Sequence, residues 1–478
     1  MSTPITKPHI LVFTGPFVSH TIVTLNTIYR LLDTFTVHLL AHSTKLILKH
    51  IESAGLGTAP IVSGDLIIDA ILQDGELEDW IDERARPFTD FYFKPTLAAH
   101  VDKALGALEV KYGQDAFKAV IMDLFYTPTL DIYRAHKMKV LVIYTAAATF
   151  FDLFQSVSKE SVESDPDGLL TIPGLNGRDG KLVEFKNIDL VEITSPVAAL
   201  IGMGGSVRDR VDGVIFGAGC VPLEGTIRDA APKRGAPSFF TGPVCPEWFL
   251  KVIEGDEDLR AQRVNELTPE QKVAIDFLDK QPERSVLYIA LGSGRFFTGE
   301  QCKLIHDTVT RLNIPTLFVN RSSQDSATLF PGADTSKFCV VKWAPQLDVL
   351  AHPSVRCCFS HAGWGSVTES LLSSIPMLAA PVFGDQFIDA KWMEALGTSF
   401  GQVSINPRVH SNRTPRFPEG AEPQLEALLG AVYNQQQWEE KRKVSLDIGT
   451  RMRAAALGTD GTKNGELDAL KSVLLSFY

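Results

Sequence analysis

Short apolar runs of strand length recur through both halves of this chain, and stretches with helical periodicity separate them. In the first half the runs lie at 9–15, 35–41, 118–125, 139–145 and 212–217. In the second half they lie at 285–293, 315–320, 338–344, 356–362 and 377–383. Alternation of strands with helices is the sequence pattern of parallel βαβ units. The pattern therefore predicts an α/β protein with two Rossmann-like, parallel-sheet domains.

A charged segment without a strand pattern separates the two halves. It follows a Gly242-Pro243 pair, and such pairs mark breaks in regular structure. The last segment has apolar residues at helical spacing, so we expect a final helix that packs on another surface. The expected parts are an N-terminal domain over 1–244, a linker over 245–275, a C-terminal domain over 276–460 and a C-terminal helix over 461–478.

The charge balance argues against nucleic acid as a partner. The 478 residues carry a net charge of −11, whereas phosphate neutralisation requires a basic surface. No apolar run reaches the roughly 18 residues of a membrane span, and the N-terminal stretch MSTPITKPHILVFTG is typical of a first strand rather than a signal peptide. We expect no nucleic-acid partner, no integral membrane anchor and a cytoplasmic location.

The cysteines indicate neither a disulfide framework nor a zinc site. They are scattered, with no CxxC and no Cys/His spacing. A reducing compartment fits this usage best. The cysteines are Cys220, Cys245, Cys302, Cys339, Cys357 and Cys358.

The stretch that begins at Trp343 provides groups that suit a nucleotide. The indole of Trp343 can stack on a flat base, and His361 can donate a hydrogen bond to a phosphate. Gly363, Gly365 and Ser366 open a predicted helix. The free N–H groups and the positive dipole end of a helix favour a diphosphate at such a position.

The same stretch continues with groups that suit sugars. Glu369 lies one helical turn beyond Gly365, where a carboxylate can accept hydrogen bonds from the two hydroxyls of a ribose. Asp385 and Gln386 follow the next apolar run, MLAAPVF. Ligands of open parallel sheets bind at the carboxyl ends of the strands. Asp385 also begins a helical pattern, so a helix N-cap is an alternative role that is compatible with sugar binding.

This stretch resembles the donor-binding signature of family 1 UDP-dependent glycosyltransferases. Trp-x-Pro-Gln, His-x-Gly-Trp-x-Ser-x-x-Glu and Asp-Gln occur in the order and at the spacing of that signature between Trp343 and Gln386. One position departs from it, because Gly365 stands where many members carry Asn, a side-chain donor to the diphosphate. The resemblance implies a GT-B fold, in which two Rossmann-like domains face each other across a cleft. The N-terminal domain would bind the acceptor, the C-terminal domain would bind the UDP-sugar, and the last helix would cross back to the first domain.

The resemblance also implies roles for single residues. Trp343 and Gln346 would line the nucleoside, with the backbone at Ala344 reading the uracil edge. Ser293 resembles the family's phosphate-side serine, and its alternative is a turn residue. In that family the terminal Gln of the signature goes more often with UDP-glucose than with galactose or glucuronate donors. The remaining donor-site positions of the motif are His361, Gly363, Trp364, Gly365, Ser366, Glu369, Asp385 and Gln386.

A histidine at the first strand-to-helix turn is the candidate general base. His20 lies over the carboxyl end of the first strand, and histidine readily accepts a proton near neutral pH. A carboxylate partner would orient its ring. Asp123, at the end of another predicted strand, matches the family's aspartate of the His–Asp pair. The alternatives are a helix-capping histidine and a solvated strand-end aspartate.

Together these features favour an inverting glycosyltransferase. His20 would deprotonate a hydroxyl of a small hydrophobic acceptor, which attacks UDP-glucose and displaces UDP. We expect no metal, no cofactor besides the UDP-sugar co-substrate, and a monomer. The alternatives are a non-catalytic UDP-sugar-binding protein of the same fold and a transferase for another nucleotide sugar. A nicotinamide-dependent oxidoreductase is disfavoured, because no Gly-x-Gly-x-x-Gly follows the first strand.

Overall fold

The chain forms two compact units in a computed structural model. Unit 1 comprises Met1–Ser156, Ile193–Val244 and Gly458–Tyr478, and unit 2 comprises Val157–Glu192 and Cys245–Leu457. The structure describes residues 7–15, 18–71, 95–149, 151, 164–165, 167–186, 210–230, 236–292, 296–322, 324–382, 385–404 and 414–478.

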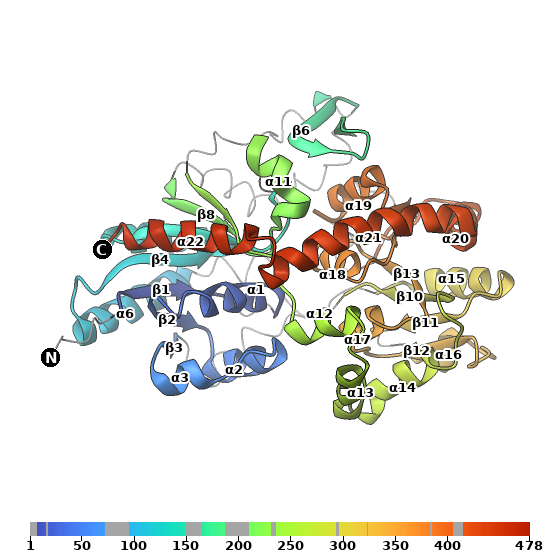
Figure 1. Cartoon of the computed structure of the whole chain (residues 1–478), viewed down its shortest axis with the longest axis horizontal. Helices are drawn as coiled ribbons and strands as arrows, with labels where there is room; N and C mark the ends of the chain where they lie inside the picture. The colour runs from blue at the N-terminus through green and yellow to red at the C-terminus, as the bar shows by residue number, and fades with distance from the viewer. Residues whose placement is uncertain are drawn as a thin grey trace. The chain divides into compact units, whose positions relative to one another are not determined.

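A parallel sheet forms the centre of unit 1 (Figure 1). Within the described residues it has seven strands in the order β3-β2-β1-β4-β5-β8-β9, and every neighbouring pair is parallel. The order reverses between β1 and β4, which is where ligands bind in open α/β sheets. The strands are β1 (His9–Phe13), β2 (Thr36–Ala41), β3 (Leu66–Ala70), β4 (Phe117–Asp123), β5 (Lys139–Tyr144), β8 (Gly213–Phe216) and β9 (Ser238–Phe240).

Helices connect these strands. The helical segments of unit 1 are α1 (Val18–Tyr29), α2 (Thr44–Ser53), α3 (Ala59–Ser63), α6 (Pro95–Tyr112), η1 (Leu124–Thr129), α7 (Leu130–Ala135), α11 (Val221–Ala230) and α22 (Thr462–Leu475).

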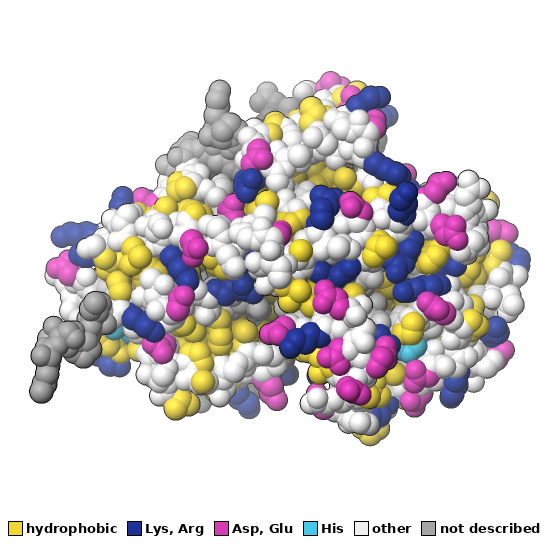
Figure 2. All heavy atoms as spheres, in the orientation of Figure 1, with side chains coloured by type: hydrophobic (Ala, Val, Ile, Leu, Met, Phe, Trp, Pro, Cys, Tyr) yellow, Lys and Arg dark blue, Asp and Glu magenta, His cyan; other side chains and the backbone are white. Residues whose placement is uncertain are grey.

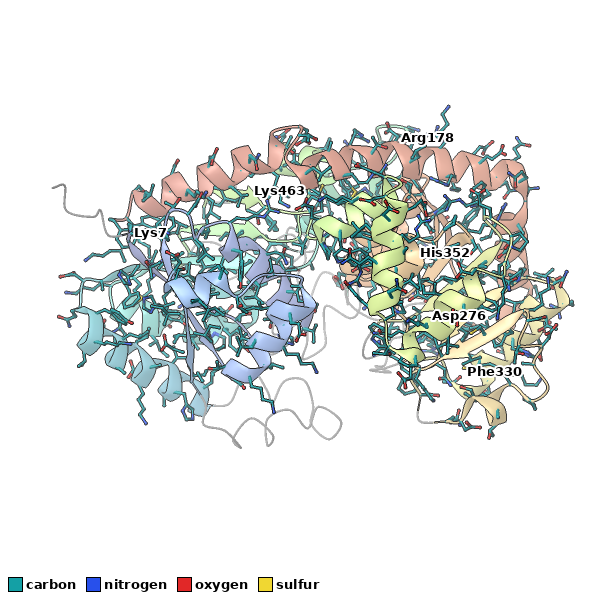
Figure 3. The ribbon with its side chains drawn as sticks, turned by 60° about the horizontal axis from the view of Figure 1, so that its bottom comes forward. Lys7, Arg178, Asp276, Phe330, His352 and Lys463 are labelled. Carbon is teal, nitrogen blue, oxygen red and sulfur yellow. The ribbon has the colours of Figure 1, made fainter. Side chains whose placement is uncertain are left out.

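The last helix, α22, packs on unit 1 against β9. Buried Lys463 donates from Nζ to the carbonyl oxygen of Pro243 at 2.9 Å (Figure 3). Glu466 accepts from Arg228 at 2.9 Å and from the backbone N–H of Phe240 at 2.9 Å. These contacts connect α22 to β9, the edge strand at one end of the unit 1 sheet.

Unit 2 contains the second parallel sheet. In its described part the order is β12-β11-β10-β13-β14-β15, again with only parallel neighbours. The expectation of two parallel-sheet, Rossmann-like domains is therefore confirmed. The strands are β10 (Val286–Ala290), β11 (Thr316–Val319), β12 (Phe338–Val341), β13 (Val355–Ser360), β14 (Met377–Ala379) and β15 (Ser399–Gln402).

Alternating side chains of the unit 2 strands fill two hydrophobic cores. On β10, Leu287 and Ile289 belong to one core, whereas Tyr288 belongs to the other. The neighbouring cysteines Cys357 and Cys358 of β13 divide between the two cores in the same way. This alternation follows from the two-residue period of a strand that is covered on both faces.

The helices of unit 2 surround this sheet. They are α12 (Glu247–Ile253), α13 (Glu257–Glu266), α14 (Pro269–Leu278), α15 (Gly299–Arg311), α16 (Ser326–Leu329), α17 (Gln346–Leu350), α18 (Trp364–Leu372), α19 (Asp385–Leu396), α20 (Ala421–Tyr433) and α21 (Gln435–Leu457). Lys and Arg side chains gather over α21 on the face shown in Figure 2.

The expected linker over 245–275 is instead built into unit 2. It forms α12, α13 and most of α14, and α13 and α14 contact α17. Asp256 caps α13 by accepting from the N–H of Leu259, and Thr268 forms a capping box with Gln271 at α14. These are helix-start signals, which outweigh the charged composition that suggested a linker.

A hairpin from the first half of the sequence also belongs to unit 2, so the expected N-terminal domain over 1–244 is not continuous. Strands β6 (Leu169–Asn176) and β7 (Leu182–Lys186) pair antiparallel. Trp392 of α19 donates to the carbonyl oxygen of Asn176 at 3.2 Å, and the N–H of Arg178 donates to that of Ala395 at 2.9 Å.

All six cysteines are free thiols. None of the helices in the described ranges is long and apolar enough to cross a membrane.

Candidate functional site

The predicted catalytic pair of unit 1 is in direct contact. His20 is the third residue of α1, and Asp123 is the last residue of β4. Nδ1 of His20 lies 2.7 Å from Oδ2 of Asp123. Since β1 leads into α1 and pairs with β4, the topology brings both side chains to the carboxyl ends of neighbouring strands.

Burial differs between the two partners. Asp123 is 1% exposed, whereas the side chain of His20 is 19% exposed. A carboxylate only accepts hydrogen bonds, so Nδ1 carries the proton and Nε2 is the basic nitrogen. Near this site, the hydroxyl of Thr21 donates to the carbonyl oxygen of Gly15 at 2.7 Å, which ties the start of α1 to the end of β1. The arrangement suits proton abstraction by Nε2.

In unit 2, the turn after β13 encloses the ring of His361. The turn requires a left-handed residue, Ala362, at φ 59°. A Cβ at Gly292 would lie 2.8 Å from Cε1 of His361, and a Cβ at Gly363 would lie 2.6 Å from its Nε2. Glycine is therefore needed on both sides of the imidazole. The close approach of Gly292 to His361 was missed from the sequence, although Gly292 is the first glycine of the LGSG segment at 291–294.

Helix α18 begins without a side-chain cap. Its N-cap residue is Gly363, which makes no capping hydrogen bond. Gly365 is exposed, and Ser366 is buried at the start of the same helix. Uncapped N–H groups at a helix start have no intrahelical partner, so this position suits an anion such as a diphosphate.

Trp364 was predicted as a donor-site residue, but its side chain packs elsewhere. The indole is 3% exposed and stacks on Trp392 of α19, with ring centroids 6.0 Å apart and an interplanar angle of 4°. The stack instead joins α18 to α19, the helix that begins at Asp385.

The predicted nucleoside residues lie around the starts of α17 and α18. Trp343 is 45% exposed, as a stacking plate for a base requires, and Ala344 is buried beside it. Nε2 of Gln346 donates to Oε2 of Glu369 at 2.6 Å. Burial raises the pKa of Glu369 to about 7, and the hydrogen bond from Gln346 opposes this shift. Glu369 therefore has a donor partner already in place.

The last two predicted donor residues open α19. Asp385 is half-buried, whereas Gln386 is 5% exposed. Oε1 of Gln386 accepts from the N–H of Val382 at 2.9 Å, so this side chain also fixes the loop after β14. The hydrogen bond from Val382 to Gln386 was not predicted from the sequence. The predicted phosphate-side residue, Ser293, lies outside the described residues.

In the sequence, 73–100 and 150–205 break the alternation of strands and helices, so the acceptor site is expected there; both stretches lie mostly outside the described residues. Among the residues that are described, no group of three or more His, Cys, Asp and Glu side chains could hold a metal ion.

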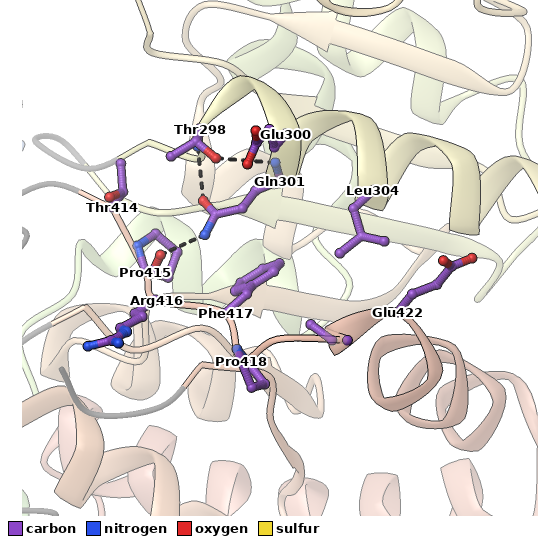
Figure 4. Close-up of a pocket in the computed structure, with 12 residues that line it drawn as sticks. Thr298, Glu300, Gln301, Leu304, Thr414, Pro415, Arg416, Phe417, Pro418 and Glu422 are labelled. Atoms are coloured by element: carbon purple, nitrogen blue, oxygen red, sulfur yellow. Dashed lines mark hydrogen bonds between the residues drawn. The ribbon is translucent and has the colours of Figure 1, made fainter.

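A pocket of about 510 Å³ lies elsewhere in unit 2, between the start of α15 and the segment before α20 (Figure 4). It is lined in part by Glu300, Arg416 and Phe417. Nε2 of Gln301 donates to the carbonyl oxygen of Pro415 at 2.7 Å and joins its two walls. None of the predicted site residues lines this pocket, so it is distinct from the donor groups described above.

Comparison with known proteins connects this geometry to a family. A family model described as "UDP-glucoronosyl and UDP-glucosyl transferase" matches residues 245–412. A flavonol 7-O-beta-glucosyltransferase of Arabidopsis thaliana is 36% identical over 167 residues, which cover 34% of this chain and 36% of that protein. UDP glycosyltransferase 9 of Catharanthus roseus is 27% identical over 323 residues, which cover 64% of this chain and 66% of that protein. Mogroside I-E synthase of Siraitia grosvenorii is 31% identical over 231 residues, which cover 48% of this chain and 50% of that protein.

The chain thus spans between about a third and two thirds of the length of these curated relatives. Solved structures match the whole fold. A transferase from Siraitia grosvenorii in complex with UDP has a TM-score of 0.74 at 16% identity and covers 98% of this chain and 99% of that one. A UDP-glucosyltransferase from Polygonum tinctorium has a TM-score of 0.73 at 20% identity, with 99% of both chains covered.

The family model covers the segment from Trp343 to Gln386, where the motif residues surround the start of α18. The solved structures share the two-sheet fold. Residues 245–412 of this chain are thus similar to the UDP-glucoronosyl and UDP-glucosyl transferase family, and the chain shares its fold with solved UDP-glycosyltransferase structures.

Proposed function

We propose that this protein is an inverting glycosyltransferase that moves a sugar, glucose by preference, from a UDP-sugar to a hydroxyl of a small hydrophobic acceptor. The observation that carries the proposal is the 2.7 Å contact between His20 and Asp123 at the carboxyl edge of the unit 1 sheet. A protein that only binds UDP-sugars has no need for an oriented base.

In the proposed reaction, Nε2 of His20 takes the proton of the acceptor hydroxyl while Asp123 stabilises the resulting imidazolium. The acceptor oxygen then forms a bond to the anomeric carbon as the bond from that carbon to the UDP oxygen breaks. Attack from the face opposite to UDP inverts the anomeric centre. An α-linked donor therefore yields a β-glycoside.

The donor groups of unit 2 would bind the nucleotide. Trp343 would stack on uracil beside the backbone of Ala344, and Glu369 with Gln346 would bind the ribose. The start of α18, His361 and Ser293 would spread the charge of the departing diphosphate. Asp385 and Gln386 would bind hydroxyls of the transferred sugar.

The acceptor class is inferred from relatives. One curated relative is a flavonol 7-O-beta-glucosyltransferase, and another is a mogroside I-E synthase. A solved relative from Phytolacca americana holds UDP-2fluoro-glucose and pterostilbene. These names support a hydroxyl-bearing, largely apolar small molecule, such as a phenol or a terpenoid, as the acceptor of this chain.

The test is a screen of phenolic, terpenoid and sterol acceptors with UDP-glucose, UDP-galactose and UDP-glucuronate. Mass spectrometry should detect a hexose added to at least one acceptor, with stoichiometric release of UDP, and NMR of the product should show a β-linkage. The His20→Ala variant is the control, since it should bind UDP while losing turnover of alcohols. UDP binding without turnover of any acceptor would favour the non-catalytic alternative, and no UDP binding at all would refute the proposal.

A further inference from the structure

A chain of hydrogen bonds runs from the interior of unit 2 to the predicted ribose carboxylate. Tyr288 lies on β10 and is 1% exposed. Its hydroxyl donates to Oε1 of Gln346 at 3.4 Å, and Nε2 of Gln346 donates to Oε2 of Glu369 at 2.6 Å. The three residues come from β10, α17 and α18, so these hydrogen bonds connect the centre of the sheet with the two helices that carry the predicted nucleoside residues.

This arrangement defines the orientation of the Gln346 amide. A side-chain amide has one accepting end and one donating end. The carboxylate of Glu369 requires the donating end, and the hydroxyl of Tyr288 supplies a donor for the accepting end. A rotated amide would place its oxygen against the carboxylate, which can only accept, so Glu369 selects the orientation. The Tyr288 hydroxyl can donate or accept, and in this orientation it donates to the amide oxygen and holds the side chain in place.

The orientation matters for the charge on Glu369. Burial raises the pKa of this carboxyl group to about 7, and the hydrogen bond from Gln346 lowers it. Donation to a carboxylate favours its charged form. The charged form is also the one that accepts two hydrogen bonds from ribose hydroxyls. A correctly held Gln346 thus keeps Glu369 in the state that binds ribose.

We propose that Tyr288 is a positioning residue for ribose recognition, which acts by holding Gln346 against Glu369. Tyr288 itself need not touch the nucleotide. The inference rests on the proposed function, because it takes Glu369 as the acceptor for the ribose hydroxyls. The proposal gives Tyr288, a buried strand residue that also packs in the core, a role in the preference for nucleotides with ribose hydroxyls.

The experiment compares UDP with 2′,3′-dideoxyuridine diphosphate, which lacks both hydroxyls that Glu369 would accept. Dissociation constants are measured by titration calorimetry for the wild type and for Tyr288→Phe. The variant should bind UDP about three- to tenfold more weakly, the range expected for one hydrogen bond. Its affinity for the dideoxy nucleotide should stay within about twofold of the wild type. With saturating UDP-sugar, kcat should not change.

A matched control is Tyr433→Phe. The hydroxyl of Tyr433 donates to the carbonyl oxygen of Ser285 at 2.8 Å, just before β10 begins. This variant also removes one phenol hydroxyl from the interior of unit 2, but it has no link to Glu369 in the described contacts. It should leave the ratio of the two dissociation constants unchanged. Equal ratios in Tyr288→Phe and Tyr433→Phe would overturn the inference.

Two further variants keep the inference testable. Adding Tyr288→Phe to Gln346→Met should cause no further loss of UDP affinity, because the link is already broken. Should Tyr288→Phe fail to fold, Gln346→Met alone must lower the preference for UDP over the dideoxy nucleotide, and an unchanged preference would overturn the inference. Absence of UDP binding by the wild type would refute the proposed function, whereas UDP binding with an unchanged ratio refutes only the role of Tyr288.

Discussion

The substitution Asp123→Asn tests the catalytic pair most directly. Asparagine has nearly the same shape, so the 1% exposed site keeps its packing while the negative charge is removed. The amide oxygen can still accept from Nδ1 of His20, but it cannot stabilise an imidazolium as a carboxylate does. The perturbation therefore acts on the transition state for proton abstraction rather than on the fold.

The size of the effect follows from the geometry. With Nδ1 and Oδ2 2.7 Å apart, the two charges are centred about 4 Å from each other, which gives about 4 kcal/mol at an effective dielectric constant of about 20. Each 1.36 kcal/mol corresponds to about tenfold in rate. The expected fall in kcat is thus about 10³-fold for an alcohol acceptor, within the usual range for general acid–base catalysis. The KM for UDP-glucose should stay nearly constant.

The assay measures kcat on an alcohol and on a matched nitrophenol. An acceptor that ionises easily needs little help from a base, so the nitrophenol should lose far less than the alcohol. The double variant with His20→Ala should be no slower than His20→Ala alone, because the two residues act as one unit. Asp115→Asn is the control, since Asp115 precedes the other end of β4 and its side chain is 93% exposed. Equal losses on both acceptors, or wild-type turnover of the alcohol, would refute the assignment.

Three further predictions concern unit 2. In the proposed site, ribose hydroxyls would stabilise the carboxylate of Glu369, whose pKa burial raises to about 7. UDP affinity, measured by calorimetry against pH, should therefore be full above about pH 7 and fall below it, while Glu369→Gln keeps only the titration of the nucleotide phosphate near pH 6. Gly365→Asn should fold and retain or tighten UDP affinity in calorimetry, because no atom lies within 4 Å of the added Cβ; a loss above about tenfold would contradict this. Gly449→Ala should lower the free energy of unfolding, measured by urea denaturation, by about 1–3 kcal/mol, because the added Cβ would overlap the carbonyl oxygen of Leu371. Gly430→Ala has open space around the added Cβ and should raise the free energy of unfolding by up to about 1 kcal/mol. A change of the same sign in both variants would contradict the packing argument.

The sheet strands were predictable because each carries a continuous apolar run. All ten strands expected from the sequence are present, with ends shifted by a few residues. The short strands β3, β9 and β15 were missed, since three to five residues at or near a sheet edge give little periodic signal. The helices over 245–275 were missed for another reason. Their caps at Asp256 and Thr268 were readable, but the charged composition was given more weight than the caps.

Long-range contacts could not be predicted from local patterns. The hairpin of β6 and β7 belongs to unit 2 because Asn176 and Arg178 bond to α19, more than 200 residues further along the chain. The motif placed Trp364 in the predicted donor segment, but it could not tell that the indole stacks on Trp392. Nor could it tell that Gln346 bonds to Glu369, because a motif specifies spacing and not side-chain partners.

Helix α18 shows why the donor residues need support from the rest of unit 2. Its first turn would face the diphosphate and its middle carries Glu369, so a small shift of the helix would move both groups together. Its end is held by guanidinium groups of α21: Arg453 donates to the carbonyl oxygen of Leu372 at 2.6 Å, and Arg442 donates to that of Ser374 at 2.8 Å. Positive charge at a helix C-terminus also opposes the negative end of the helix dipole. An anion at the first turn and guanidinium groups at the end of α18 would therefore stabilise the same helix from both ends, so the proposed donor site would hold the diphosphate through backbone N–H groups near Gly365.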